Sequence, residues 1–303
     1  MRRMYLAGAA MAGMLVLAGC SGASGSEDRP TVVVTTNILG DVVENVVGDA
    51  ADVTTLMKPN ADPHSFEISA QEASLLGRAD LVVSNGLGLE EGLQQHLDRA
   101  ADAGVATFVA GTAVDVLAYS EANEDTPDPH FWTDPARMRD VVDALENTLA
   151  SIDSIDTTTV EENAERYRAE LAELDAEMTT AFGSVPEPRR NLVTNHHVFG
   201  YLAERFDFRI VGAIIPGGTT LASPSASDLR ELSAAIVETG VPAIFAESSQ
   251  PDRLVQILAD EADLDVEVIE LFTESLTEPG QGAETYLEMM RANTERITAG
   301  LSP

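Results

Sequence analysis

Residues 159–182 have the sequence TVEENAERYRAELAELDAEMTTAF and separate two halves of similar pattern. The apolar residues recur every three or four positions, as on one face of an α-helix: Val160, Ala164, Tyr167, Leu171, Leu174, Met178 and Phe182. At about 1.5 Å per residue the helix would be about 36 Å long, and Pro186 and Pro188 would end it. The pattern predicts either a coiled-coil arm or a rigid connector between two lobes.

On both sides of this segment, short β-branched runs alternate with helical patterns. We expect strands at 31–35, 52–57, 81–84, 105–109, 191–194, 208–213, 243–246 and 266–271. We expect helices after the first strand to about residue 47 and at 69–78, 89–101, 135–150, 199–205, 226–238, 251–261 and 284–298. This alternation predicts an α/β fold with two lobes, each a mainly parallel four-stranded sheet with flanking helices, joined by one long rigid linking helix.

The N-terminal residues have the features of an export signal. Arg2 and Arg3 precede an apolar run to about Leu17, which is too short to cross a bilayer. The sequence Leu17-Ala18-Gly19-Cys20 resembles the bacterial lipoprotein box, in which the cysteine is lipidated and becomes the mature N-terminus. The alternative is a buried free cysteine. We therefore predict an extracytoplasmic protein anchored to the outer face of the cell membrane through lipidated Cys20, without a transmembrane helix.

The predicted organisation has five parts: a signal peptide (1–19), a lipidated flexible tether (20–30), an N-terminal lobe (31–151), the linking helix with its flanks (152–188) and a C-terminal lobe (189–303). The composition fits a folded protein, since 44% of residues are hydrophobic. The formal net charge of −33 disfavours nucleic acid or an anionic membrane surface as the main partner and is compatible with a cationic ligand.

Three of the five histidines follow predicted strands. His64 and His130 each end an Asp-Pro-His tripeptide, and His196 follows the first strand of the second half. Ligands of α/β sheets bind beyond the carboxyl ends of strands, so these histidines could meet between the lobes. Imidazole binds Zn, Mn, Fe or Cu, and a carboxylate from Glu274, after the last strand, could complete a four-ligand set. The proline before His64 and His130 restricts the backbone there.

Each of these residues also has an ordinary structural interpretation. A single loop histidine is usually a surface residue, and an acid such as Glu274 is common in this chain. We expect His197 to contact the ligand residues or solvent and His96 to be an exposed helix position. The acidic run 121–128 is expected to be a solvated loop. The glycines of 86–92 do not have the spacing of a dinucleotide-binding loop and predict a turn into a helix.

Several segments together resemble one known family, the cluster A-I solute-binding lipoproteins of zinc and manganese ABC importers. The matching segments are 60–67 (NADPHSFE), 84–90 (SNGLGLE), 128–135 (DPHFWTDP), 193–196 (VTNH), 199–201 (FGY), 224–229 (PSASDL), 243–247 (AIFAE) and 286–291 (YLEMMR). The resemblance implies two α/β lobes, a rigid linking helix and one metal in the cleft. It carries His64, His130 and His196 over as metal ligands, with Glu274 where the family often has aspartate.

The resemblance also bears on the metal. Family members with three histidines are mostly zinc-specific, and those for manganese commonly have glutamate at the third position, so His196 favours Zn²⁺ over Mn²⁺. The long His-rich loop of many zinc members is replaced here by 121–125. We therefore expect a monomeric metal-capture protein, not an enzyme, that delivers zinc to an ABC permease in the cytoplasmic membrane.

Other functions remain open on the sequence. They are a manganese-specific importer component, a zinc-dependent hydrolase, a surface adhesin stabilised by metal and a binder of another solute. The hydrolase would require a general base and a substrate pocket beside the metal, and the sequence shows neither.

Overall fold

The computed structural model describes residues 29–119, 126–215, 217, 219–249, 255–256 and 266–302. The signal peptide with Cys20, most of the acidic run 121–128 and most of the helix expected at 251–261 lie outside the described residues.

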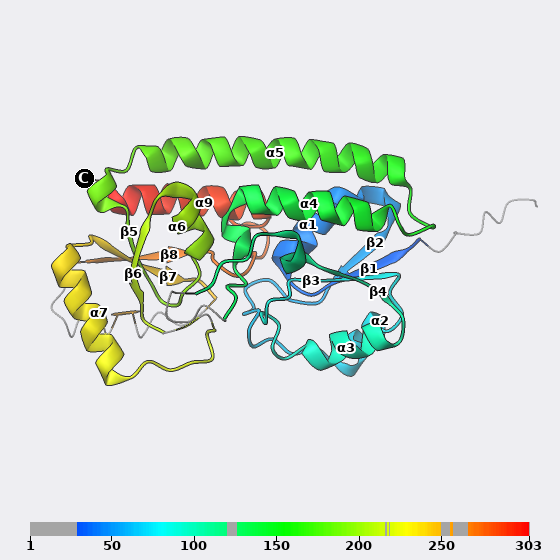
Figure 1. Ribbon diagram of the computed structural model, residues 1–303, viewed down its shortest axis with the longest axis horizontal. Helices are drawn as coiled ribbons and strands as arrows, with labels where there is room; N and C mark the ends of the chain where they lie inside the picture. The colour runs from blue at the N-terminus through cyan, green and yellow to red at the C-terminus, as the bar shows by residue number, and fades with distance from the viewer. Residues whose placement is uncertain are drawn as a thin grey trace, which may run out of the picture.

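The first half of the chain forms a parallel sheet whose strand order is β2-β1-β3-β4. Its strands are β1 (Thr31–Val34), β2 (Asp52–Thr55), β3 (Leu81–Ser84) and β4 (Ala106–Val109). Its connecting helices are α1 (Asn37–Val47), α2 (Ala70–Leu76) and α3 (Gln94–Asp102). Figure 1 shows α1 on one face of this sheet and α2 with α3 on the other, so the nearly continuous apolar runs of β1 and β3 are covered on both sides.

The second half repeats this topology, with the strand order β6-β5-β7-β8 and parallel pairing throughout. Its strands are β5 (Asn191–Thr194), β6 (Arg209–Ala213), β7 (Ala243–Glu247) and β8 (Glu267–Leu271). Its described helices include α6 (Gly200–Phe206), α7 (Ala226–Thr239) and α9 (Tyr286–Leu301). In both sheets the second strand is added on one side of the first strand, and the third strand is added on its other side. Such a switch point leaves a crevice at the carboxyl ends of the strands.

Helix α5 (Thr157–Gly183) connects the two halves. Its buried residues are the seven of the predicted stripe, and they pack against α1 and α4 (Pro135–Leu149) on one side and α9 on the other. Figure 1 shows α5 lying along both sheets. The segment is therefore a connector and not a projecting arm. One continuous apolar core, which includes Val32, Leu171 and Phe245, runs beneath it through both halves.

Most strands and helices agree with the sequence prediction within a few residues, but the helix expected at 89–101 begins only at Gln94. The residues before it form a turn in which Gly86, Leu87 and Gly88 have positive φ. The buried carboxylate of Glu90 closes this turn by accepting the backbone N–H groups of Asn85 at 2.7 Å and Gly86 at 3.1 Å. A phosphate would need these same N–H groups, so the turn is not a dinucleotide-binding loop.

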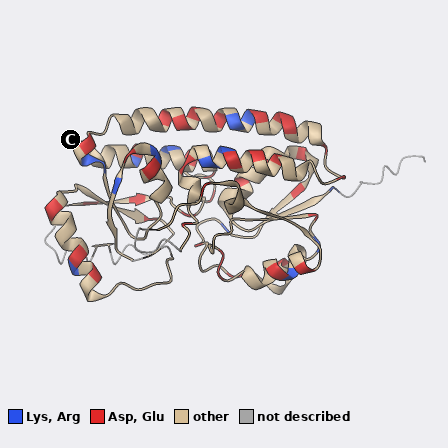
Figure 2. Ribbon diagram, in the orientation of Figure 1, with Lys and Arg blue, Asp and Glu red and all other residues tan. Residues whose placement is uncertain are grey.

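Figure 2 shows acidic residues distributed along the helices, including α3, α4, α5 and α7. No helix within the described ranges is both long and apolar enough to cross a membrane.

Candidate metal site

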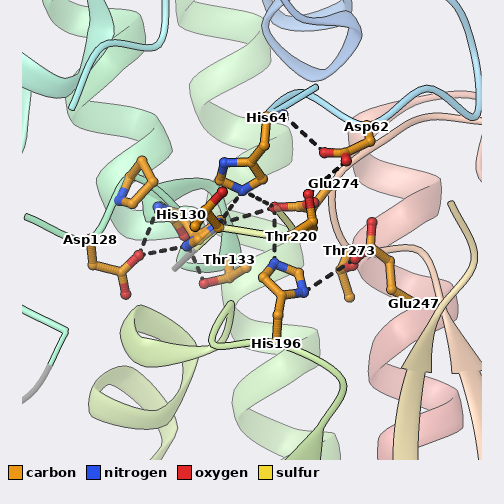
Figure 3. Close-up of polar contacts among 12 residues, drawn as sticks. Asp62, His64, Asp128, His130, Thr133, His196, Thr220, Glu247, Thr273 and Glu274 are labelled. Atoms are coloured by element: carbon orange, nitrogen blue, oxygen red, sulfur yellow. Dashed lines mark hydrogen bonds and ion pairs between the residues drawn. The ribbon is translucent and has the colours of Figure 1, made fainter. Parts of the chain in front are cut away.

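Four side chains predicted from the sequence meet at one place. One ligand atom from each of His64, His130, His196 and Glu274 lies within 4.8 Å of the others. Figure 3 shows the three rings directed from different sides toward the carboxylate of Glu274. None of the four residues is more than 2% exposed. The site is thus a closed cluster between the two sheets.

Each of these residues follows a β-strand. His64 lies in the loop between β2 and α2, and His130 comes directly before the 3₁₀ turn Phe131–Thr133 that leads into α4. His196 and Glu274 follow β5 and β8 within three residues. Because the strands are parallel within each sheet, their carboxyl ends share an edge.

The two Asp-Pro-His tripeptides form the same local turn. The backbone N–H of His64 donates to Asp62 Oδ1 at 2.9 Å, and the N–H of His130 donates to Asp128 Oδ1 at 3.0 Å. An aspartate that accepts an N–H two residues later makes an Asx turn. The aspartates therefore fix the backbone at both histidines, a role that the repeated tripeptide signalled and that we had assigned to proline alone.

The ligand atoms are spaced as a small metal ion requires. Glu274 Oε1 lies 2.9 Å from Nε2 of His64 and 3.0 Å from Nε2 of both His130 and His196. Nε2 of His64 and Nε2 of His130 are 3.4 Å apart. Tetrahedral bonds of about 2.0–2.1 Å place ligand atoms about 3.3 Å apart. These four distances lie within a few tenths of an ångström of that spacing, and all the ligand atoms lie within 4.8 Å of one another.

One ring is hydrogen-bonded to a carboxylate at its other nitrogen, and a second lies beside one. His130 Nδ1 lies 2.7 Å from Asp128 Oδ1, while His196 Nδ1 lies 3.2 Å from Glu247 Oε2, an ion-pair distance without hydrogen-bond geometry. Such a partner holds the proton on Nδ1 and leaves Nε2 free to bind a metal. Nδ1 of His64, by contrast, is buried and has no hydrogen-bond partner within the described ranges of the chain. His64 is held instead through its backbone.

The electrostatics of the cluster favour a cation. Burial opposes the charge of Glu274, but His196, His130 and His64 outweigh it and hold the pKa of this carboxyl well below its usual value. Burial likewise opposes the charged imidazoles, yet the neighbouring carboxylates raise the pKa of His130 and His196. Oε2 of Glu274 is also buried and has no hydrogen-bond partner among the residues that the structure describes. The buried carboxylates thus attract positive charge, which a divalent ion supplies.

Aromatic rings and a cavity flank the cluster. The Trp132 ring lies 5.2 Å from the His130 ring and the Tyr119 ring 6.2 Å from it, measured between centroids. Tyr119 also contacts His197, and both line a cavity of about 670 Å³. His197 is half-buried, and burial lowers its pKa. It lies outside the four-residue cluster, as does His96 on α3.

One expectation is wrong at this site. Asp128 was grouped with a solvated acidic loop, but it is fully buried. Its carboxylate is needed inside because it accepts both the backbone N–H and the ring of His130. Glu247 is a further acidic residue beside the site. Its signals in the sequence are its place directly after the predicted strand 243–246 and its inclusion in the family-like segment AIFAE.

Comparisons with known proteins identify the family and the fold of this chain. The family model described as "ZnuA: Zinc-uptake complex component A periplasmic" matches residues 32–300. The zinc-binding protein TroA of Treponema pallidum is 31% identical over 95% of both chains, and the manganese-binding lipoprotein MntA of Halalkalibacterium halodurans is 28% identical over 95% of both. The structure of periplasmic zinc-binding TroA superimposes with a TM-score of 0.84, covering 91% of this chain and 100% of TroA. The chain therefore belongs to the ZnuA family (cluster A-I), the metal-binding components of zinc and manganese ABC importers, which are not enzymes.

Proposed function

We propose that this protein captures one divalent transition metal, with zinc favoured over manganese, and delivers it to an ABC permease. The ligands would be Nε2 of His64, His130 and His196 and the carboxylate of Glu274. The observation that carries the proposal is the convergence of these four buried groups within 4.8 Å. The ion is cargo, so the site has to bind it tightly and later release it.

The chemistry of the four groups supports zinc. Three imidazoles and one carboxylate match the tetrahedral nitrogen and oxygen sets that Zn²⁺ accepts. Mn²⁺ is better suited by carboxylate, carbonyl and water ligands in octahedral geometry. Relatives carry both names, since TroA is called zinc-binding and MntA manganese-binding. Manganese is therefore the second candidate.

The decisive test is a competitive titration of metal-stripped protein (residues 21–303) with zinc and manganese, followed by heat and by bound metal. We expect one tightly bound zinc per chain, and we expect it to be lost in His64→Ala. The control is His96→Ala, which removes a histidine of α3 outside the cluster and should bind as the unchanged protein does. Tight manganese with weak zinc would overturn the metal preference, and no stoichiometric metal would overturn the site.

The anchoring at Cys20 and the lobe boundaries at residues 151 and 188 stay predictions, as does the monomeric state. We expect the full-length chain to sediment with membranes after cell lysis and Cys20→Ser to lose this association. Several relatives, MntA among them, are named lipoproteins, which supports the anchor. Recovery of Cys20→Ser in the membrane fraction at the unchanged level would contradict it.

A further inference from the structure

Glu274 follows β8 of the second sheet, but its segment is held by the first half of the molecule. The last contacts to the second half before it are made by Phe272. The backbone N–H of Phe272 donates to Asn293 Oδ1 at 2.9 Å, and Asn293 Nδ2 donates back to the Phe272 carbonyl at 2.6 Å. Asn293 lies on α9, so β8 and α9 hold the chain up to residue 272.

From Thr273 to Leu276, the backbone hydrogen bonds to other described parts of the chain run to the first half, although the Glu274 side chain also contacts His196 and Thr277 bonds to Ala283. Trp132 Nε1, from the turn before α4, donates to the Thr273 carbonyl at 2.8 Å. The Leu276 carbonyl accepts the backbone N–H of Asn60 at 2.9 Å. These two bonds enclose Glu274 from both sides along the chain.

Asn37 makes the most specific of these contacts. Its Oδ1 accepts the backbone N–H of Leu276 at 3.0 Å, and its Nδ2 donates to Ser275 Oγ at 2.8 Å. Nδ2 also donates to the Lys58 carbonyl at 3.2 Å, which ties the segment to the loop after β2. Asn37 is the first residue of α1 and is buried, as are Ser275 and Leu276. An amide that uses both its donor and its acceptor on neighbouring residues fixes their orientation as well as their distance.

We propose that Asn37 is a positioning residue for metal binding, which holds the Glu274 carboxylate in place from the first half of the molecule. The proposal rests on the function proposed above. By this proposal, the first half of the molecule holds Glu274 together with His64 and His130. His196 belongs to the second half, where its Nδ1 lies 3.2 Å from Glu247 Oε2 of β7 and Thr194 Oγ1 of β5 donates to its carbonyl at 2.6 Å. A shift between the halves would therefore separate His196 from three ligands that stay together.

The test compares Asn37→Ala with the unchanged full chain, using Co²⁺ as a coloured probe and zinc for affinity. Losing a group that is hydrogen-bonded directly to a ligand ordinarily costs about 10–100-fold in metal affinity. Asn37 instead holds the two residues after the ligand, so we expect Asn37→Ala to lose about 10-fold, at the lower end of this range. We also expect its Co²⁺ absorption spectrum to shift in the direction seen for Glu274→Gln. Ser275→Ala removes only one of the two side-chain contacts and should give a smaller shift of the same kind.

Two matched controls separate positioning from general stability. Asn45→Ala removes another side-chain amide of α1, one that donates to the Asp41 carbonyl within the same helix. Gln281→Ala removes an exposed hydrogen bond between the halves, which Asn60 donates to Gln281. Both should keep the original affinity and spectrum. The inference is overturned if Asn37→Ala binds Co²⁺ with an unchanged spectrum, even where its thermal stability is lower. Failure of the unchanged protein to bind metal would instead overturn the proposed function.

Discussion

Asp62 and Asp128 occupy equivalent positions in the two Asp-Pro-His tripeptides but have different hydrogen-bond partners. Both accept the backbone N–H of the histidine two residues later. Only Asp128 also reaches the imidazole ring, at 2.7 Å from His130 Nδ1. The second carboxylate oxygen of Asp62 instead accepts hydrogen bonds from Ser65 Oγ at 2.8 Å and Thr220 Oγ1 at 2.6 Å. The same tripeptide thus fixes a loop in one case and a loop and a ligand ring in the other.

This difference predicts unequal effects of two matched substitutions. Asp128→Ala removes the group that fixes the tautomer of His130, so zinc affinity should fall about 10–100-fold. Asp62→Ala leaves the ring contacts of His64 unchanged and should lower the affinity less. Zinc affinity is measured by competition with a chelator, and circular dichroism checks that both variants are folded. Equal losses for the two variants would contradict the role given to the Asp128 carboxylate.

At the scale of elements, helices α1 and α9 meet through Asp41. Asp41 Oδ2 accepts the backbone N–H of Tyr286, the first residue of α9, at 3.0 Å. A carboxylate at a helix N-terminus is normally stabilised by the helix dipole. Here burial is the larger effect and raises the pKa of Asp41 from 3.8 to about 6. Burial therefore favours the neutral carboxyl group, and the hydrogen bond from the Tyr286 N–H opposes it without outweighing it.

The free energy of unfolding should reflect this pKa. The folded protein holds the Asp41 proton more tightly than the unfolded chain, so stability falls as the pH rises from about 4 to about 6. Asp41→Asn keeps an acceptor for the Tyr286 N–H and carries no charge. It should therefore be more stable than the unchanged protein by about 2–3 kcal/mol at pH 7.5, with a difference near zero at pH 4.

Urea unfolding at the two pH values measures this difference. Asp49→Asn serves as a control because Asp49 is exposed in the 3₁₀ turn after α1. At each pH, the free energy of unfolding of Asp41→Asn is compared with that of the unchanged protein. A gain that is no larger at pH 7.5 than at pH 4 would contradict the burial argument.

At the scale of the whole molecule, α5 makes the two halves one folding unit. Leu171 and Leu174 near its middle are fully buried in the core that both halves share. The helix contacts α1 and α4 of the first half and α9 of the second. Rotation of one sheet against the other would have to break this packing, so we expect metal binding to change local loops and a small tilt, not a wide hinge.

Leu171→Ala tests the shared core. Removing a buried leucine side chain typically costs about 2–5 kcal/mol, and the loss should lower the unfolding midpoint of the whole chain in a single transition. Glu173→Ala, on the exposed face of the same helix, should change the free energy of unfolding by less than about 0.5 kcal/mol. Two separate transitions in Leu171→Ala would show that the halves unfold independently and would contradict a common core.

Local patterns explain why much of this protein follows from its sequence. The stripe from Val160 to Phe182 has the helical period, and the structure buries those seven residues. The β-branched runs and the turns between them set the order of strands and helices. His196 stands directly beyond β5, where topology brings it to the sheet edge. His64 and His130 lie in longer loops after β2 and β4, and there the Asp-Pro-His turns fix the backbone. Periodicity and strand ends are short-range features, so they can be recognised in one chain.

Only the tertiary structure shows the long-range contacts. Three features depend on residues that are distant in sequence. Thr35 donates to the buried Glu90, Tyr201 donates to the carbonyl of the buried Asp128, and Glu247 lies beside His196. The attachment of the Glu274 segment to Asn37 joins positions 238 and 239 residues apart. A hydrogen bond of this kind forms because the fold has brought both partners together, and no local period or propensity records it.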